Sequence, residues 1–89
     1  MEETLEALAQ ALRKTPVEAA SIPRFLELSR LLHRLPPTRE RDGLLALVYL
    51  RLYQLRREEE DFLLGYSYAR TSRVEAVRLL AERLKGEGL

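Results

Sequence analysis

The residue types that could carry out catalysis are few in this 89-residue chain. It has one histidine, His33, and no cysteine, which excludes thiolate chemistry, disulfides and cysteine-bound zinc. A general base or metal ligand needs a partner at fixed spacing, and one helical turn before His33 stand Ser29 and Arg30 rather than carboxylates. A catalytic role would require the fold to bring carboxylates beside the imidazole. Otherwise we expect His33 at the edge of an amphipathic helix.

The acidic run EEED, which begins at Glu58, is the densest group of possible metal ligands. Successive side chains on a helix point about 100° apart, so the four carboxylates cannot all bind one ion. Glu58 and Asp61 could share a divalent cation with groups from elsewhere in the chain. Arg56 with Glu60, and Arg57 with Asp61, have the spacing of weak helical ion pairs. The run therefore predicts a solvated, ion-paired turn, and we expect no enzyme, metal or cofactor.

The stretch LLGYSYARTSRVEA, residues 63–76, combines a glycine, two tyrosines and two arginines. Arginines bind phosphates or guanine edges, and hydroxyl side chains at a helix start contact phosphates. A helix, a short turn with glycine and a second helix is the order of a helix-turn-helix motif. The alternative is a glycine-capped corner whose tyrosines pack on the core. If the stretch binds DNA, we expect contacts from Tyr66, Tyr68, Arg70, Thr71, Ser72, Arg73 and Arg78.

The segment from Leu35 to Leu84 resembles the C-terminal DNA-reading region of bacterial sigma factors. Within it, LRREEEDFLLGYS is similar to that family's first helix and turn in its length and in its Leu, Glu-Glu, Leu-Gly and Ser positions. The resemblance implies that residues 70–73 begin the reading helix. Glu60 and Asp61 stand where the family keeps an apolar and a small residue, and the turn is two or three residues longer.

These residues must be positioned by helices, because no segment alternates apolar and polar residues over the length of a strand. Apolar residues at helical spacing predict a helix over about 3–14, with Glu2 and Glu3 in its first turn. TPVE at 15–18 has the pattern of a capping box and starts a short turn. Pro23 opens a second helix that ends before the prolines at 36–37. A second capping box, SRVE, begins the last helix, at 73–85, and 86–89 is a flexible tail.

The third helix, capped by Thr38, is apolar nearly all round. Such a helix is buried on several sides, so it is either a central helix or one that also meets another chain. It could run on through Leu64, with Gly65 as the residue after its end, or break near the acidic run.

The predicted fold is a single all-α domain over residues 1–89, a compact bundle of four or five helices with a long apolar central helix. We expect it to work by protein–protein contact, as a homodimer, because the third helix has more apolar surface than its short neighbours need. The alternative is a DNA-binding helix-turn-helix regulator using the turn at 65–73 and the helix at 73–85. The expected protein interface comprises Leu45, Leu47, Tyr49, Leu50 and Leu52.

The composition sets the remaining expectations. A net charge of +1 and a pI near 8.1 give no overall attraction to nucleic acid or to anionic membranes, which leaves a local basic patch to be found. The longest apolar run has seven residues and the first residues lack a signal pattern, so we expect a cytoplasmic protein. The absence of asparagine and the abundance of Glu and Arg suit a thermophile.

Overall fold

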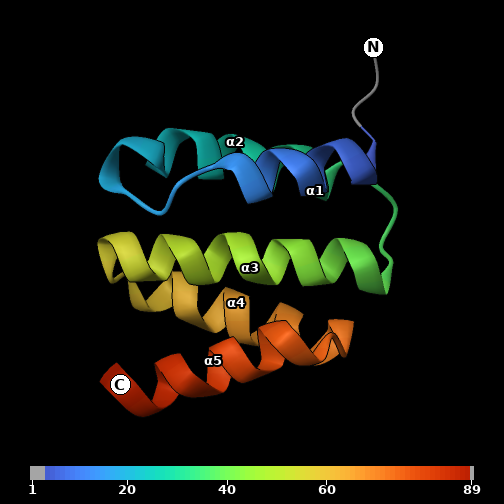
Figure 1. Cartoon of the computed structure of the whole chain (residues 1–89). Coiled ribbons are helices and arrows are strands. Elements are labelled where there is room, and N and C mark those ends of the chain that lie inside the picture. The colour runs from blue at the N-terminus through green and yellow to red at the C-terminus, as the bar shows by residue number, and fades with distance from the viewer. Residues whose placement is uncertain (1–3, 89) are drawn as a thin grey trace.

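The structure, a computed structural model, describes residues 4–88 as helices joined by short connections (Figure 1). The α-helices are α1 (Leu5–Lys14), α2 (Ile22–His33), α3 (Arg39–Arg56), α4 (Glu59–Ser72) and α5 (Glu75–Gly88), with a short 3-10 turn at Ala19–Ser21. The described part of the chain contains no strand, which confirms the all-α prediction. Its radius of gyration is 12.1 Å, as expected for a compact fold of this length. Within residues 4–88, no helix is long and apolar enough to cross a membrane.

The helices run alternately in opposite directions and form two pairs around α3 (Figure 1). One hydrophobic cluster joins α1 and α2 to α3 and includes Leu8, Phe25 and Leu28. A second cluster joins α4 and α5 to α3 and includes Phe62 and Val77. Each pair therefore has its own core, and α3 contributes to both.

The expected protein interface lies largely inside these two clusters. Leu45 and Leu52 belong to the first cluster, Leu50 belongs to the second, and none of the three is exposed to solvent. Leu47 packs against both clusters, and Tyr49 is partly buried against the first. The expectation that Leu45, Leu50 and Leu52 are left over for a second chain is wrong, because α3 is covered on two sides by helices of its own chain.

The acidic run begins a new helix instead of continuing α3. Arg57 ends α3 in the left-handed conformation, with φ 55°, and its guanidinium lies 4.9 Å from the ring centroid of Tyr53. Glu58 is extended, and the next three acidic residues fill the first turn of α4, where the helix dipole favours negative charge. The break prevents the predicted i,i+4 ion pairs. Arg56 instead pairs with buried Asp61 across it, with an N–O distance of 2.7 Å.

Gly65 does not end a helix, because it lies in the middle of α4. Among the described glycines none has a positive φ, so the left-handed conformation is not the reason for glycine here. A Cβ atom built at Gly65 would lie 2.7 Å from Cδ2 of Leu50 and 3.1 Å from its backbone nitrogen. Gly65 therefore allows α4 to pack closely on α3, and the turn predicted at 65–73 is helix through residue 72.

The predicted helix starts are correct at Thr38 but wrong at both capping boxes. The Thr38 hydroxyl accepts a hydrogen bond from the Arg41 amide at 3.1 Å, as expected of an N-cap. Thr15 instead follows the end of α1, where its hydroxyl donates to the Ala11 carbonyl. Ser72 is instead the last residue of α4, where its hydroxyl donates to the Ala69 carbonyl. The next helix, α5, begins only at Glu75.

One further boundary differs, at the C-terminal end of the chain. The predicted tail is helical at residues 86–88, because Gly86 is exposed and a glycine is tolerated in an exposed helix at a modest cost. Residue 89, and the predicted first-turn acids Glu2 and Glu3, lie outside the described residues.

Candidate functional site

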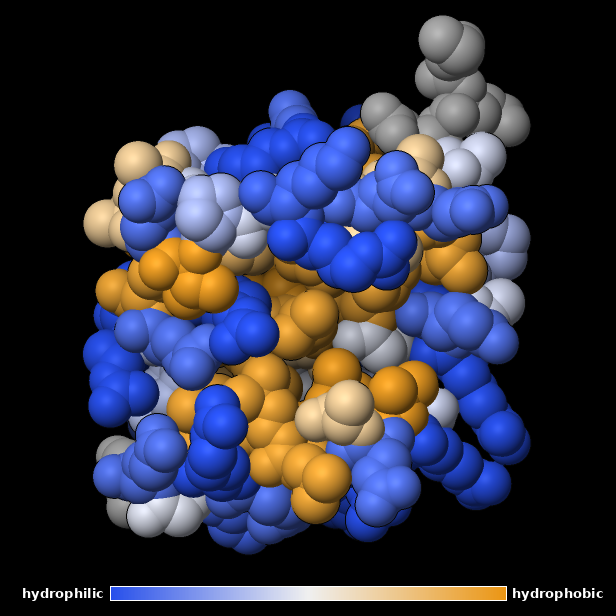
Figure 2. All heavy atoms as spheres, in the orientation of Figure 1, coloured by the Kyte–Doolittle hydropathy of each residue, from blue (hydrophilic) through white to orange (hydrophobic). Residues whose placement is uncertain are grey.

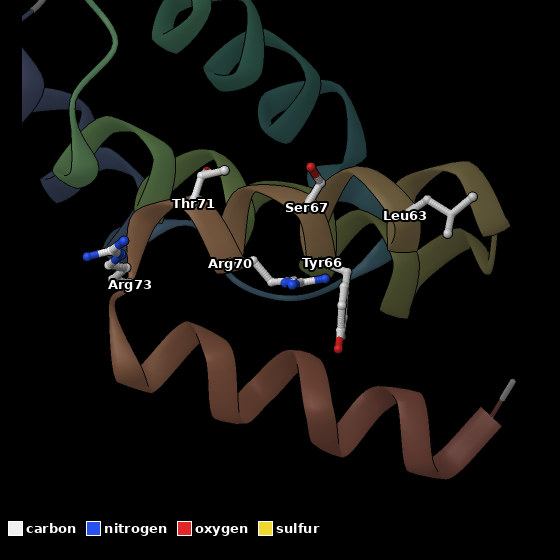
Figure 3. Close-up of a pocket in the computed structure, with 6 residues that line it drawn as sticks. All are labelled: Leu63, Tyr66, Ser67, Arg70, Thr71 and Arg73. Atoms are coloured by element: carbon white, nitrogen blue, oxygen red, sulfur yellow. The ribbon is translucent and has the colours of Figure 1, made fainter.

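A shallow groove with a volume of about 640 Å³ follows the last three turns of α4 and the turn after it (Figure 3). A second hollow of about 350 Å³ continues it onto α5 and shares three of its residues. We call the combined feature the arginine groove. Its central residues are Tyr66, Arg70, Arg73, Arg78 and Glu82.

Helical spacing and a tight turn bring these side chains together. Tyr66, Arg70 and Arg73 are separated by four and three residues, which places them along one side of α4. Figure 3 shows Tyr66 extending from α4 toward α5 and Arg73 at the turn between the helices. Arg73 ends α4 in the left-handed conformation, with φ 59°, and only Val74 separates it from α5. The turn therefore carries a charged side chain where glycine is usual.

The arginine groove carries more positive than negative charge. Arg70, Arg73 and Arg78 are exposed, and within residues 4–88 none has a carboxylate oxygen within 4.0 Å. Glu82 is the one carboxylate in the groove, and it accepts a hydrogen bond from the Tyr66 hydroxyl at 2.8 Å. The three guanidinium groups are therefore free to bind an anion.

Tyr66 holds the two walls of the groove together. Its ring lies 5.6 Å from that of Phe62 on α4, and the ammonium group of Lys85 on α5 lies 5.4 Å from its centroid. With the bond to Glu82, this tyrosine makes both polar and cation–π contacts to α5. Tyr66 therefore links α4 to α5 beside the three arginines.

Two of the seven expected DNA contacts, Ser72 and Tyr68, do not line the arginine groove, and the hydroxyl of a third, Thr71, is engaged within the chain. Ser72 is 1% exposed and its hydroxyl is used within the chain, so it is not available to a ligand. Tyr68 packs toward both core clusters. Thr71 borders the groove, but its hydroxyl lies 3.2 Å from a carboxylate oxygen of Asp42. The prediction was wrong here because residues of a continuous helix were taken for a turn, which would have exposed all of them.

Sequence reasoning missed Glu82, Leu63 and Ser67 as groove residues. Leu63, Ser67 and Arg70 have the spacing of one helix side, a signal that appears only once α4 is known to continue past Gly65. Nothing in the local sequence indicates the bond of Glu82 to Tyr66, which is sixteen residues away.

His33 lies beside tyrosines rather than carboxylates. Its Nε2 atom is 2.9 Å from the Tyr49 hydroxyl, and its ring centroid is 5.9 Å from that of Tyr68. The two tyrosine rings stack, with centroids 6.0 Å apart and an angle of 8° between their planes. The cluster ties α2, α3 and α4 together and does not supply the carboxylates that a catalytic role for His33 would need.

We predict that this cluster destabilises the protein at alkaline pH. Burial raises the pKa of the Tyr49 hydroxyl above its usual value of 10.0, and the charge of Tyr68 raises it further. A raised pKa favours the neutral phenol in the fold, so its contribution to stability is present below about pH 10 and is lost as the pH rises through the folded-state pKa. Urea denaturation between about pH 8 and pH 11 should show that the free energy of unfolding falls more steeply with pH in the wild type than in Tyr49→Phe. Equal slopes would contradict the prediction.

The acidic run does not form a metal site. Both carboxylate oxygens of Asp61 accept hydrogen bonds from Arg56, at 2.7 and 3.0 Å. Nowhere in residues 4–88 do three or more histidine, aspartate or glutamate side chains gather in a way that could hold a metal ion.

Comparison of the chain with protein-family models, curated proteins and solved structures found no match. The sigma-factor resemblance places the start of a reading helix at residues 70–73, where the structure has the end of α4.

Proposed function

We propose that this protein binds nucleic acid by contacting the sugar–phosphate backbone through the arginine groove. The observation that carries the proposal is that Arg70, Arg73 and Arg78 are exposed around one groove with no carboxylate partner within residues 4–88. Other arginines of the chain, such as Arg24, Arg41 and Arg56, form ion pairs with nearby acids. Three of the arginines without such a partner line one hollow of the surface, which favours an anionic ligand there.

The shape of the groove supports a polymeric ligand. Its arginines come from two helices and the turn between them, and it lies open along the surface (Figure 3). Sites for small ligands are usually enclosed and mostly apolar, and bury most of the ligand. A row of separate guanidinium groups instead suits successive phosphates, each held by charge-assisted hydrogen bonds.

The proposed binding has little sequence preference. Asparagine and glutamine read adenine, but the chain has no asparagine, and its two glutamines, Gln10 and Gln54, are not among the groove residues. Arginine can also bind the edge of guanine. These arginines, however, are spread over two helices and the turn between them, and the close packing of the helix pair on α3 fixes the position of both helices. We therefore propose contacts that position the protein on the backbone without selecting a base sequence.

Titration of a labelled mixed-sequence DNA duplex tests the proposal. Three phosphate contacts should give a slope of log affinity against log salt of about −2.7, which weakens binding roughly fortyfold between about 50 and about 200 mM salt. Fluorescence anisotropy at the two salt concentrations measures this change. The absence of binding at low salt, or binding that does not respond to salt, would remove the proposal, because backbone contacts need no particular sequence.

Self-association through α3 has less support than the sequence suggested. Three of its five expected contact residues, Leu45, Leu50 and Leu52, are fully buried within the chain. Leu47 and Tyr49 keep some exposure, but residues two positions apart on a helix lie on different sides of it. They do not make one continuous surface for a second copy.

A further inference from the structure

A second candidate surface lies along α3 on the face seen in Figures 1 and 2, between α1 and α5. Leu44, Leu47, Arg51 and Gln54 recur at intervals of three and four residues, so they share one side of α3. All four are partly exposed, although α3 is buried on the two sides next to this one. Figure 2 shows hydrophobic side chains exposed in a hollow across the middle of this face, between polar surfaces above and below. We call this feature the α3 seam.

The edge of the α3 seam formed by α5 is distinct from the arginine groove. Arg78 and Glu82 line the groove, while Ala76, Leu80 and Arg83 lie on the opposite side of α5 by helical spacing. Leu80 packs against the second cluster and remains partly exposed, as Leu47 does. The two surfaces therefore use different sides of the same helix.

Arg51 is the unusual residue of the α3 seam. Its guanidinium donates a hydrogen bond to the neutral amide oxygen of Gln54 at 2.9 Å, and within residues 4–88 it has no carboxylate within 4.0 Å. Burial lowers the pKa of Arg51, and the positive charge of Arg83 lowers it further. Arg83 itself pairs only with Glu87, at 3.9 Å and in an exposed position. A half-buried cation beside a second cation is unfavourable in the isolated chain.

We propose that the α3 seam docks an amphipathic helix of a partner protein, with apolar side chains on Leu47 and Leu80 and a carboxylate on Arg51. A carboxylate would pair with a cation that is already partly desolvated, while the apolar side chains would cover the exposed leucines. A second copy of the seam is a poorer occupant, because it would bring two further cations to Arg51 and Arg83. A sugar–phosphate backbone is also poorer, because it would leave the leucines uncovered.

The test uses two labelled synthetic helices with leucines along one face, flanked by glutamates in one and by lysines in the other. By fluorescence anisotropy, the glutamate helix should bind the full chain at least about tenfold more tightly than the lysine helix, the ratio that one ion pair of about 1.4 kcal/mol gives. Arg51→Glu should reverse this preference. Arg30→Glu is the matched control, because it makes the same charge change at an exposed arginine of α2 that lies in neither surface, and it should leave the preference unchanged.

The other outcomes would overturn the proposal. Absent binding, or equal affinities of the two helices for wild type, would remove the carboxylate site. A wild-type dimer that Arg51→Glu dissociates would make a second copy the occupant. A loss of duplex DNA binding in Arg51→Glu would assign the seam to nucleic acid instead. If circular dichroism shows that Arg51→Glu is misfolded, Arg51→Gln replaces it, and the glutamate preference should then disappear.

Discussion

Replacing Gly65 with alanine is expected to lower the free energy of unfolding by about 2 kcal/mol. The added Cβ atom would lie 2.7 Å from Cδ2 and 2.8 Å from Cγ of Leu50, closer than carbon atoms approach without a shift. Leu50 has no exposed surface and cannot turn away, and its backbone nitrogen is also close, so α3 and α4 must separate. Overpacking of this kind destabilises a fold by up to about 3 kcal/mol, and the better helix propensity of alanine offsets about 1 kcal/mol of this.

The chain contains two matched controls for this substitution. The nearest atom to a Cβ at Gly43 is Cγ2 of Val74, at 3.1 Å, and Val74 is 38% exposed and can rotate. Gly43→Ala should therefore change stability by less than about 0.5 kcal/mol. No described residue has an atom within 4 Å of a Cβ at Gly86, so Gly86→Ala should be neutral or stabilise the protein by about 0.5 kcal/mol. Urea denaturation followed by circular dichroism measures all three, and a Gly65→Ala protein as stable as Gly43→Ala would contradict the close approach.

The sequence predicted the helices better than it predicted their ends. Amphipathic spacing located α1, α2 and α5, and Thr38 located the start of α3, because these signals are local. Gly65 was misplaced because glycine serves both to end helices and to permit close packing, and only the partner residue, Leu50, distinguishes the two uses. The sequence could not decide whether the third helix breaks near Arg57, because a left-handed arginine has no sequence signature.

The candidate site was predictable in composition but not in arrangement. The arginines at 70, 73 and 78 were among the seven residues expected to contact DNA if the stretch binds it, and the structure brings these three together around one hollow. Ser72 and Tyr68 were included because a turn was assumed, and a helix directs them into the chain instead. The sequence also could not show that α3 uses its apolar residues within its own fold, because their burial depends on how all four other helices pack around α3.

Removing the arginines of the arginine groove should have the largest effect on nucleic-acid binding. Each of Arg70→Ala and Arg78→Ala removes one expected phosphate contact, so each should lower the magnitude of the salt slope by about 0.9 and the affinity at low salt roughly tenfold. Arg73 is better replaced by glycine, since its φ of 59° strains alanine and suits glycine. The variant with all three changes should lose essentially all binding of the labelled duplex at about 50 mM salt. Arg24→Ala, which removes an exposed arginine on α2, is the control and should bind as wild type does.

Glu82→Gln should raise the affinity for nucleic acid, the opposite of the effect of the arginine substitutions. It therefore distinguishes an effect of charge on binding from a loss of binding through misfolding. Glutamine keeps an oxygen that can accept the Tyr66 hydrogen bond, so the contact between α4 and α5 is retained while a negative charge leaves the groove. Affinity for the duplex should rise a few-fold at about 50 mM salt and converge on wild type at high salt, where screening reduces the influence of Glu82. Unfolded variants lose binding but do not gain it, so an increase would place the ligand beside Glu82. An unchanged affinity in Glu82→Gln, with losses in the arginine variants, would place the nucleic acid on the α4 side and the turn, away from α5.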